Sequence, residues 1–575
     1  MKRRDFVQTC AGVALTASLS QAEPETMGSV VGPKSKPPAR HLCAFRMEEL
    51  PFNVRDLRLT LHCLQGLVNR EQPRLYLVQD RYDELWLDWL RERGDVDEVE
   101  WIDIGKLFEC FLPVASCMYV TDPAIPASVN VATMLAGVHN AVVATPGMAG
   151  MFNLSMGADP DSNKVGADLR VMHWRKDVEA YRWAFAQIGD SLSRKAVAYL
   201  DPTTDAVRDY FVEFKIPIVW VSNPNDQTKP HTSFFEERDL AREVFMKWPP
   251  NIPCMGWPLE TGIGEWEGVR LASECAKFEV CSGHDGYSPT VSNLSVHSGT
   301  TATLRQRPPA APKLERDKIY YAFVRSDGDG LNFQRHYYRK LFDDPQHGRV
   351  PLGWHIGPTA ADFQPDILDY YYKHASPGDC FVNALTGVGY IHEDNYADNY
   401  PPEQREQIWR EYIELSAAYR KRIDASVIST WRVRDLGRVP GAGARSRSGG
   451  PPLRGGVQLI WRPVAGRSWA AAPTVARALG AAGAGALLGE GALLYCDEGS
   501  AFCGAGRPGA PGPERRRPAA GSTWVGSGAQ PHPRRAASLG YRARLPPQTA
   551  RRRGRRSSTT SSSSRATSRA WPTRK

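Results

Sequence analysis

The chain has 575 residues, a formal net charge of +9 and 11 cysteines, and its length is enough for two or three domains. Residues 433–575 contain 24 Arg, one Lys and five acidic residues, a net charge of +20, so residues 1–432 carry the remaining −11. Because the positive charge belongs to the C-terminal segment, it is no evidence for nucleic-acid binding by the rest of the chain, and we expect none. The cysteines form no Cys-x-x-Cys pair, which excludes a zinc ribbon.

The N-terminus has the order of features of a twin-arginine export signal. Arg3 and Arg4 precede a short apolar stretch over residues 11–19, with small residues at Ser20 and Ala22. The apolar stretch is too short to span a bilayer. We therefore predict a signal over residues 1–22, a linker over 23–40, and an exported protein, periplasmic or extracellular, without a membrane span. A basic N-terminus arising by chance is the alternative.

Residues 41–248 alternate between helical and strand patterns, which predicts an N-terminal α/β domain with a mainly parallel sheet. The predicted helices are Asp56–Asn69, Tyr82–Arg93, Asp177–Ile188 and Ala206–Phe214. The predicted strands are Arg74–Val78, Met118–Thr121, Ala141–Ala144, Ala196–Leu200 and Ile218–Val221. A Gly-x-Gly-x-x-Gly motif and a Walker loop are both absent from residues 41–248, so no nucleotide cofactor is predicted for this domain.

Residues 249–432 continue the alternation with longer loops. The predicted strands are Ile252–Trp257, Phe278–Cys281, Ile319–Arg325, Leu352–Ile356, Cys380–Leu385 and Ser426–Trp431, and the predicted helices are Gly264–Ala276, Ala360–His374 and Gln404–Ile423. This rhythm predicts an incomplete TIM-like β/α barrel with six of eight strands. In such a barrel the active site lies at the C-terminal ends of the strands.

The composition changes abruptly after Arg432, where Arg, Pro, Gly, Ala and Ser become dominant. We predict that residues 433–575 are disordered, because they contain too little apolar surface to fold. Translation of GC-rich DNA in a shifted frame explains this switch better than an anion-binding tail does. The last barrel strands would then be missing, and we expect an open, unstable or inactive barrel.

Two acidic residues follow the apolar run Tyr320–Val324 in the sequence Arg325-Ser-Asp-Gly-Asp-Gly330. Asp327 and Asp329 would then lie at the end of a buried strand. Glycoside hydrolysis requires two carboxylates on opposite sides of the scissile bond, so one of them would act with an acid from another strand end. The alternatives are a solvated turn and a calcium loop, but the Glu expected at position twelve of that loop is absent.

A second group of candidates follows the strand predicted at Cys380–Leu385. Gly387 and Gly389 would allow close approach of a ligand, and Tyr390 offers a face for a sugar ring. Glu393 and Asp394 come next, the first as a possible proton donor and the second as a substrate contact. The alternative is a turn with Tyr390 in the core.

Further acids and aromatics follow other predicted strands. Glu265 or Glu267 could donate a proton, although acids at this position also cap helices. Trp354 could be a sugar platform or a core tryptophan. The polar loop after Phe278–Cys281 holds Asn293, a predicted substrate contact, and a weak metal-binding set of His284, Asp285 and His297. The Gly-x-Ser-x-Gly motif is missing from residues 1–432, and His-Glu-x-x-His is missing as well.

Together these motifs resemble the GxGYxYP putative glycoside hydrolase family, from about His41 to Trp431. The resemblance rests on Leu64–Arg70, Ser292–Ser298, Arg325–Asp329 and Gly387–Tyr390. It implies a family N-terminal domain and a barrel of the glycosidase type. The sequence departs from the family pattern in two places. His392 and Glu393 replace its Tyr-Pro, and Gly330 stands where Asn is usual.

The combined prediction is a glycoside hydrolase that acts on an extracytoplasmic carbohydrate without a cofactor or metal. Asp327 or Asp329 would be the base or nucleophile, and Glu265, or else Glu393, would protonate the leaving oxygen. A carbohydrate-binding protein without turnover is one alternative. A metal-dependent hydrolase using Asp327, Asp329 and His297 is another, and an inactive truncated product is a third.

Overall fold

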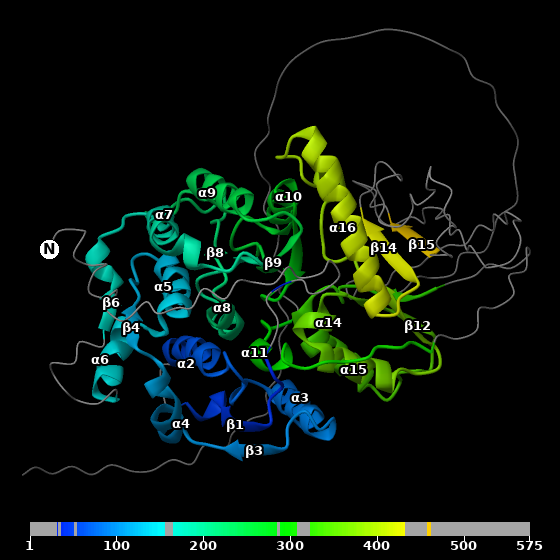
Figure 1. Ribbon diagram of the computed structural model, residues 1–575, viewed down its shortest axis with the longest axis horizontal. Coiled ribbons are helices and arrows are strands. Elements are labelled where there is room, and N and C mark those ends of the chain that lie inside the picture. The colour runs from blue at the N-terminus through cyan, green and yellow to red at the C-terminus, as the bar shows by residue number, and fades with distance from the viewer. Residues whose placement is uncertain are drawn as a thin grey trace, which may run out of the picture. The chain divides into compact units, whose positions relative to one another are not determined.

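A computed structural model describes residues 32, 36–50, 54–155, 165–284, 288–307, 322–431 and 457–461, and Figure 1 shows the course of the chain. The predicted signal and most of the predicted linker lie outside these residues, and so does nearly all of the predicted C-terminal tail.

The first two sheets are three-stranded and parallel, with strand orders β2-β1-β3 and β5-β4-β6. Their strands are β1 His41–Arg46, β2 Leu75–Val78, β3 Glu98–Trp101, β4 Cys117–Val120, β5 Ala141–Ala144 and β6 Val165–Asp168. The accompanying helices are α2 Val54–Val68, α3 Arg81–Glu92, α4 Ile104–Phe111, α5 Ala127–His139 and α6 Pro146–Ser155. Helix α3 begins where the Asp80 carboxylate accepts bonds from the Tyr82 and Asp83 amides, and its apolar side buries Trp86 and Trp89.

The third sheet is also parallel and has the strand order β10-β9-β7-β8. Its strands are β7 Val197–Tyr199, β8 Ile218–Val219, β9 Ile252–Gly256 and β10 Lys277–Cys281. The helices of this region are α7 Asp177–Ile188, α8 Arg208–Phe214, α9 Phe234–Lys247, α10 Glu265–Glu274 and α11 Leu294–His297. All five residues of β10 are buried, as expected for a strand covered on both faces.

The fourth sheet is parallel with the strand order β11-β12-β13-β14-β15. Its strands are β11 Val324–Arg325, β12 Leu352–Ile356, β13 Asp379–Asn383, β14 Val427–Trp431 and β15 Val457–Trp461. The helices are α12 Leu331–Phe333, the π-helical η5 Gln334–Tyr338, α13 Arg339–Phe342, α14 Ala360–Phe363, α15 Pro365–His374, the 3₁₀ turn η6 Glu393–Asn395, and α16 Pro402–Arg422. Strand β15 lies inside the segment predicted to be disordered, where the run Val-Gln-Leu-Ile-Trp supplies a strand that pairs with β14.

The predicted α/β class with parallel sheets is confirmed, but two predicted barrel strands lie elsewhere. Strands β9 and β10 extend the sheet of β7 and β8 instead of joining β11–β14. The described strands form four open sheets and not one closed barrel. Apolar periodicity identifies a strand without identifying its neighbours, and this explains why the boundary at residue 249 was misplaced.

An antiparallel bridge connects the third sheet to the loop that follows β13. The Glu279 amide donates to the Tyr390 carbonyl at 2.8 Å, and the Tyr390 amide donates to the Glu279 carbonyl at 3.0 Å. Glu279 lies on β10, so this pair of bonds holds the Gly-Val-Gly-Tyr segment against the third sheet.

None of the helices in the described ranges combines the length and the apolar character needed to cross a membrane.

Acid sensitivity is expected from His355 on β12. Burial lowers its pKa to about 4, and its Nε2 lies 2.8 Å from the Ser429 hydroxyl oxygen. An unfolded histidine has a pKa of about 6.5, so the unfolded chain binds the proton first as the pH falls. The contribution of neutral His355 to the free energy of unfolding should be fully present above about pH 6.5. It should fall by about 3 kcal/mol as the pH is lowered towards about 4.

Urea unfolding at several pH values between 4 and 7 checks this prediction. His355→Asn should flatten that part of the stability profile, whereas replacement of the exposed His374 by asparagine should leave it unchanged. An equal slope in wild type and His355→Asn would assign the acid sensitivity to other groups.

Candidate active site

The loop after β13 is fixed by backbone geometry that favours glycine. Thr386 and Gly387 have φ values of +68° and +119°. A Cβ atom at Gly387 would lie 2.5 Å from the Ser416 hydroxyl oxygen. The Thr386 hydroxyl donates to the Gly389 carbonyl at 2.8 Å and accepts from the Ile391 amide at 3.0 Å. These contacts make the loop a rigid support for the residues that follow.

Gly389 is needed for contact between two backbones. A Cβ atom at this position would lie 2.5 Å from Phe278 Cδ2 and 2.8 Å from the Glu279 carbonyl oxygen. The prediction that Gly387 and Gly389 admit a ligand is therefore corrected, because protein atoms occupy the space beside both. Their role is to place Tyr390.

We expect Gly389→Ala to destabilise the protein by about 1–3 kcal/mol, since the new methyl group must displace Phe278 or break the bridge to Glu279. Chemical denaturation measures the change. Gly150→Ala is the matched control, because a Cβ atom at this site in α6 meets nothing within 4 Å and alanine favours a helix. Equal stability of Gly389→Ala and wild type would show that the loop is not held by this contact.

The buried Tyr390 hydroxyl interacts with several of the predicted acids. Its side chain is 3% exposed, and its hydroxyl donates to Glu265 Oε1 at 3.2 Å. Burial raises the pKa of this hydroxyl well above its usual value, and the negative charges of Glu265, Asp329 and Glu393 raise it further. Acids from three separate segments of the chain thus raise the pKa of one buried hydroxyl.

These acids come from different parts of the chain. Glu265 is the exposed first residue of α10, Asp329 is half-buried after β11, and Glu393 is buried in η6 after β13. Asp394, also predicted as a site residue, is half-buried in the same short turn. The charges of three of the four acids predicted to be catalytic therefore raise the pKa of the Tyr390 hydroxyl, and Glu265 accepts a hydrogen bond from it.

The Asp327–Gly330 loop is attached tightly to β12. The Gly357 amide donates to the Gly328 carbonyl at 2.7 Å, and a Cβ atom at Gly328 would lie 1.8 Å from the His355 carbonyl oxygen. Asp327 has a φ of +66°, is exposed, and accepts a bond from the Ser326 hydroxyl at 3.0 Å. The negative charge of Asp329, the second acid of this loop, is among those that raise the pKa of the Tyr390 hydroxyl.

Two predicted site residues have structural roles instead. Trp354 is 2% exposed, and its indole nitrogen donates to Asp379 Oδ1 at 2.9 Å among the rings of Tyr338 and Phe342. It is a core tryptophan and not a sugar platform. The fully buried Asn293 exchanges hydrogen bonds with the Leu77 backbone at 2.8 Å in both directions, so it joins α11 to β2.

The predicted metal-binding combinations do not form. His297 is buried and places Nδ1 2.8 Å from Asp366 Oδ2 on α15. His284 is exposed, and Asp285 lies outside the described residues. A search of the described residues found metal-like spacing only at His41, Cys43 and Glu100, which are not among the predicted site residues.

Trp257 is a site residue that the sequence analysis missed. It directly follows β9, is partly exposed, and stacks on Tyr390 with ring centroids 6.3 Å apart and planes 28° apart. Trp266 and His392 also lie together near Tyr390, with ring centroids 4.6 Å apart. The position of Trp257 directly after a strand was a signal that could have identified it. The sequence analysis missed it because it included Trp257 in the predicted strand.

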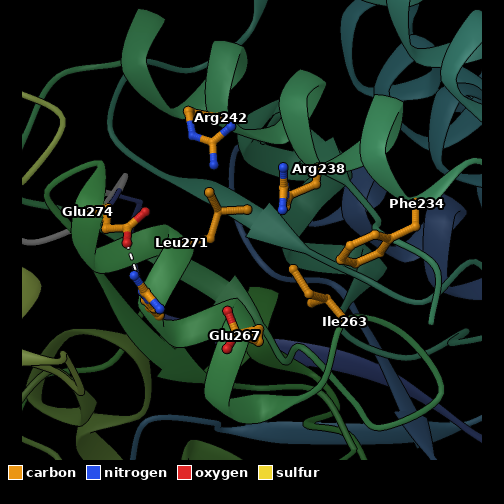
Figure 2. Close-up of a pocket in the computed structure, with 8 residues that line it drawn as sticks. Phe234, Arg238, Arg242, Ile263, Glu267, Leu271 and Glu274 are labelled. Carbon is orange, nitrogen blue, oxygen red and sulfur yellow. Dashed lines mark hydrogen bonds and ion pairs between the residues drawn. The ribbon is translucent and has the colours of Figure 1, made fainter. Parts of the chain in front are cut away.

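Glu267, the alternative to Glu265, faces a different region. It lines a pocket of about 190 Å³ between α9 and α10, where Arg238 and Arg242 extend from α9 (Figure 2). On the α10 side, Arg270 donates to Glu274 at 2.8 Å. Glu265 and Glu267 therefore lie in different surroundings. Glu265 accepts a hydrogen bond from the Tyr390 hydroxyl, whereas Glu267 lines the pocket between α9 and α10.

The described strands and helices define an α/β protein with several parallel sheets, and comparisons with known proteins show its family. Models of the four GxGYxYP domains match the chain, the first at residues 53–109, the second at 115–192, the third at 194–299 and the C-terminal putative glycoside hydrolase domain at 317–443. The chain belongs to the GxGYxYP family. The third domain contains β9 and β10, in agreement with the sheet they join.

A solved structure shares the fold. The crystal structure of a putative hydrolase from Bacteroides thetaiotaomicron VPI-5482 superposes with a TM-score of 0.56 at 17% sequence identity. The match covers 70% of this chain and 77% of that one. A search of curated proteins found no match.

Proposed function

We propose that this protein hydrolyses glycosidic bonds of an extracytoplasmic carbohydrate at the site around Tyr390. The observation that carries the proposal is the convergence of Glu265, Asp329 and Glu393 on one tyrosine hydroxyl. Hydrolysis of a glycosidic bond by two carboxylates requires acids on opposite sides of the sugar. Glu265 belongs to the third domain and Asp329 to the C-terminal domain, so the two acids are supplied by different domains.

In this proposal Glu265 protonates the leaving oxygen, and the Tyr390 hydroxyl holds its carboxyl group in position. Asp329 is the base or nucleophile, and the partly exposed Trp257 supplies aromatic surface for the sugar, whereas Tyr390 is too buried to be the sugar platform that the sequence predicted. Glu393 is the second choice for the acid, because its carboxylate is buried. The proposed substrate is a carbohydrate outside the cytoplasm, so the protein must be exported to reach it. Export through the twin-arginine signal is therefore part of the same proposal.

Asp329→Asn separates hydrolysis from binding alone. We expect it to lower kcat by at least about 100-fold, because amide nitrogen and oxygen cannot replace the carboxylate as base or nucleophile. The affinity for an oligosaccharide, measured by calorimetry, should change much less. Asp327→Asn is the matched control two residues away and should retain turnover, because its side chain is exposed whereas that of Asp329 is half-buried.

The partly exposed ring of Trp257 also suits a carbohydrate-binding protein without turnover. Oligosaccharide binding by wild type, with no release of product over long incubation, would support that alternative. Release of product that Asp329→Asn abolishes would exclude it.

A further inference from the structure

A second cluster of reactive side chains lies on the first sheet, apart from the proposed site. His41 and Cys43 on β1 pair in register with Glu98 and Glu100 on β3. Residues two apart on a strand point to the same face, so the four side chains share one face of the sheet. Strand β3 is at the edge of this sheet, near α4, as Figure 1 shows.

The distances within the cluster suit a tetrahedral metal ion. His41 Nε2 lies 3.8 Å from Glu100 Oε2, and Cys43 Sγ lies 3.9 Å from the same oxygen. The three ligand atoms all lie within 4.8 Å of one another. Ligands around tetrahedral zinc are roughly 3.4–3.8 Å apart, given metal–ligand bonds of about 2.0–2.3 Å. A small contraction of the side chains would therefore complete the site.

The other nitrogen of the imidazole has the partner that a metal-bound histidine usually has. His41 Nδ1 lies 3.1 Å from Glu98 Oε2, so it can donate its proton to that carboxylate. A carboxylate on Nδ1 leaves Nε2 as the atom with an available lone pair, and Nε2 is the nitrogen that faces Glu100 and Cys43. An ordinary surface ion pair does not need this orientation.

A competing ion pair uses a different oxygen of the shared carboxylate. Lys106 on α4 contacts Glu100 Oε1, whereas Oε2 faces His41 and Cys43. The Lys106 side chain is also 47% exposed, and exposed ion pairs are weak. The lysine is therefore no obstacle to coordination through Oε2.

We propose that His41 Nε2, Cys43 Sγ and Glu100 Oε2 bind Zn²⁺, with Glu98 positioning the imidazole. On binding, the Cys43 thiol loses its proton to solvent and coordinates as a thiolate. The mixed nitrogen, sulfur and oxygen set suits zinc and excludes magnesium and calcium, which take oxygen ligands. The ion would join β1 to the edge strand β3 and stabilise the first domain.

Titration of the metal-free full-length protein with Co²⁺, followed by Zn²⁺, tests the proposal. We expect one Co²⁺ to give a thiolate-to-cobalt charge-transfer absorption that Zn²⁺ then displaces. Cys43→Ser should abolish this absorption and weaken Zn²⁺ binding at least about tenfold, the loss that even outer partners of a metal site cause. Cys380→Ser, which removes a comparable half-buried thiol from β13, should retain both.

Zinc should also raise the melting temperature of wild type and Cys380→Ser but not that of Cys43→Ser. Three results would overturn the proposal. They are an unchanged absorption in Cys43→Ser, no stoichiometric binding by wild type, and a Cys43–Cys110 disulfide in protein purified without reductant. The readouts are spectroscopic and thermal, so the result does not depend on whether the protein hydrolyses glycosides.

Discussion

Glu265→Gln is expected to reduce turnover of a susceptible oligosaccharide by about 10²–10⁴-fold, the usual contribution of a positioned general acid. Glutamine keeps the shape of the side chain and can accept the bond from the Tyr390 hydroxyl, but it has no proton to give to the leaving oxygen. The loss should therefore appear in kcat, with little change in stability. Steady-state kinetics and a thermal melt of the same preparation measure both quantities.

Glu267→Gln is the matched control for this prediction. Glu267 is in the same turn of α10 and is exposed, as Glu265 is, but it lines the pocket with Arg238 and Arg242 (Figure 2). Its replacement should leave kcat unchanged. If Glu267→Gln lowered kcat and Glu265→Gln did not, the acid would be assigned to the wrong residue.

Asp83→Ala is expected to destabilise the protein by about 3–5 kcal/mol, because it leaves a buried arginine without its main partner. Arg335 is 1% exposed and Asp83 is fully buried, and Arg335 Nη2 lies 2.7 Å from Asp83 Oδ1. Asp83 also accepts bonds from the Ser292 hydroxyl at 2.6 Å and the Gln79 amide at 2.8 Å. The Ser292 hydroxyl and the Gln79 backbone amide would lose this acceptor, and Arg335 would keep only its bonds to Asp80 at 3.1 Å.

This ion pair connects the first domain to the segment that follows the Asp327–Gly330 loop. Arg335 belongs to η5, and the preceding Gln334 donates to the Gly328 carbonyl at 2.6 Å. Denaturation of Asp83→Ala should be compared with Asp88→Ala, whose carboxylate is 71% exposed on α3 and should matter by less than about 0.5 kcal/mol. Equal effects of the two substitutions would contradict a stabilising role for the buried pair.

The sequence was sufficient to predict most elements but not their partners. Runs such as Leu352–Ile356 and Asp177–Ile188 have the period of a strand or helix, and the structure confirms both. The partner of β9 depends on which strand offers a free edge in space, and that information is not local. For this reason the barrel boundary was misplaced while the strands themselves were found.

The candidate site was predicted in part for a similar reason. Acids and aromatics at strand ends identified Glu265, Asp329 and Tyr390 as candidates, and the structure places a hydrogen bond between Tyr390 and Glu265. The signal failed at Trp354 and Asn293, because polar and aromatic residues at strand ends also make core hydrogen bonds. Only burial and the position of hydrogen-bond partners separate these cases, and both require the fold.

The most direct test is a crystal structure of Glu265→Gln with an uncleaved oligosaccharide. The account predicts a sugar ring against Trp257, with its glycosidic oxygen between residue 265 and Asp329. An oligosaccharide bound elsewhere, or one whose glycosidic bond is out of reach of both carboxyl positions, would contradict it.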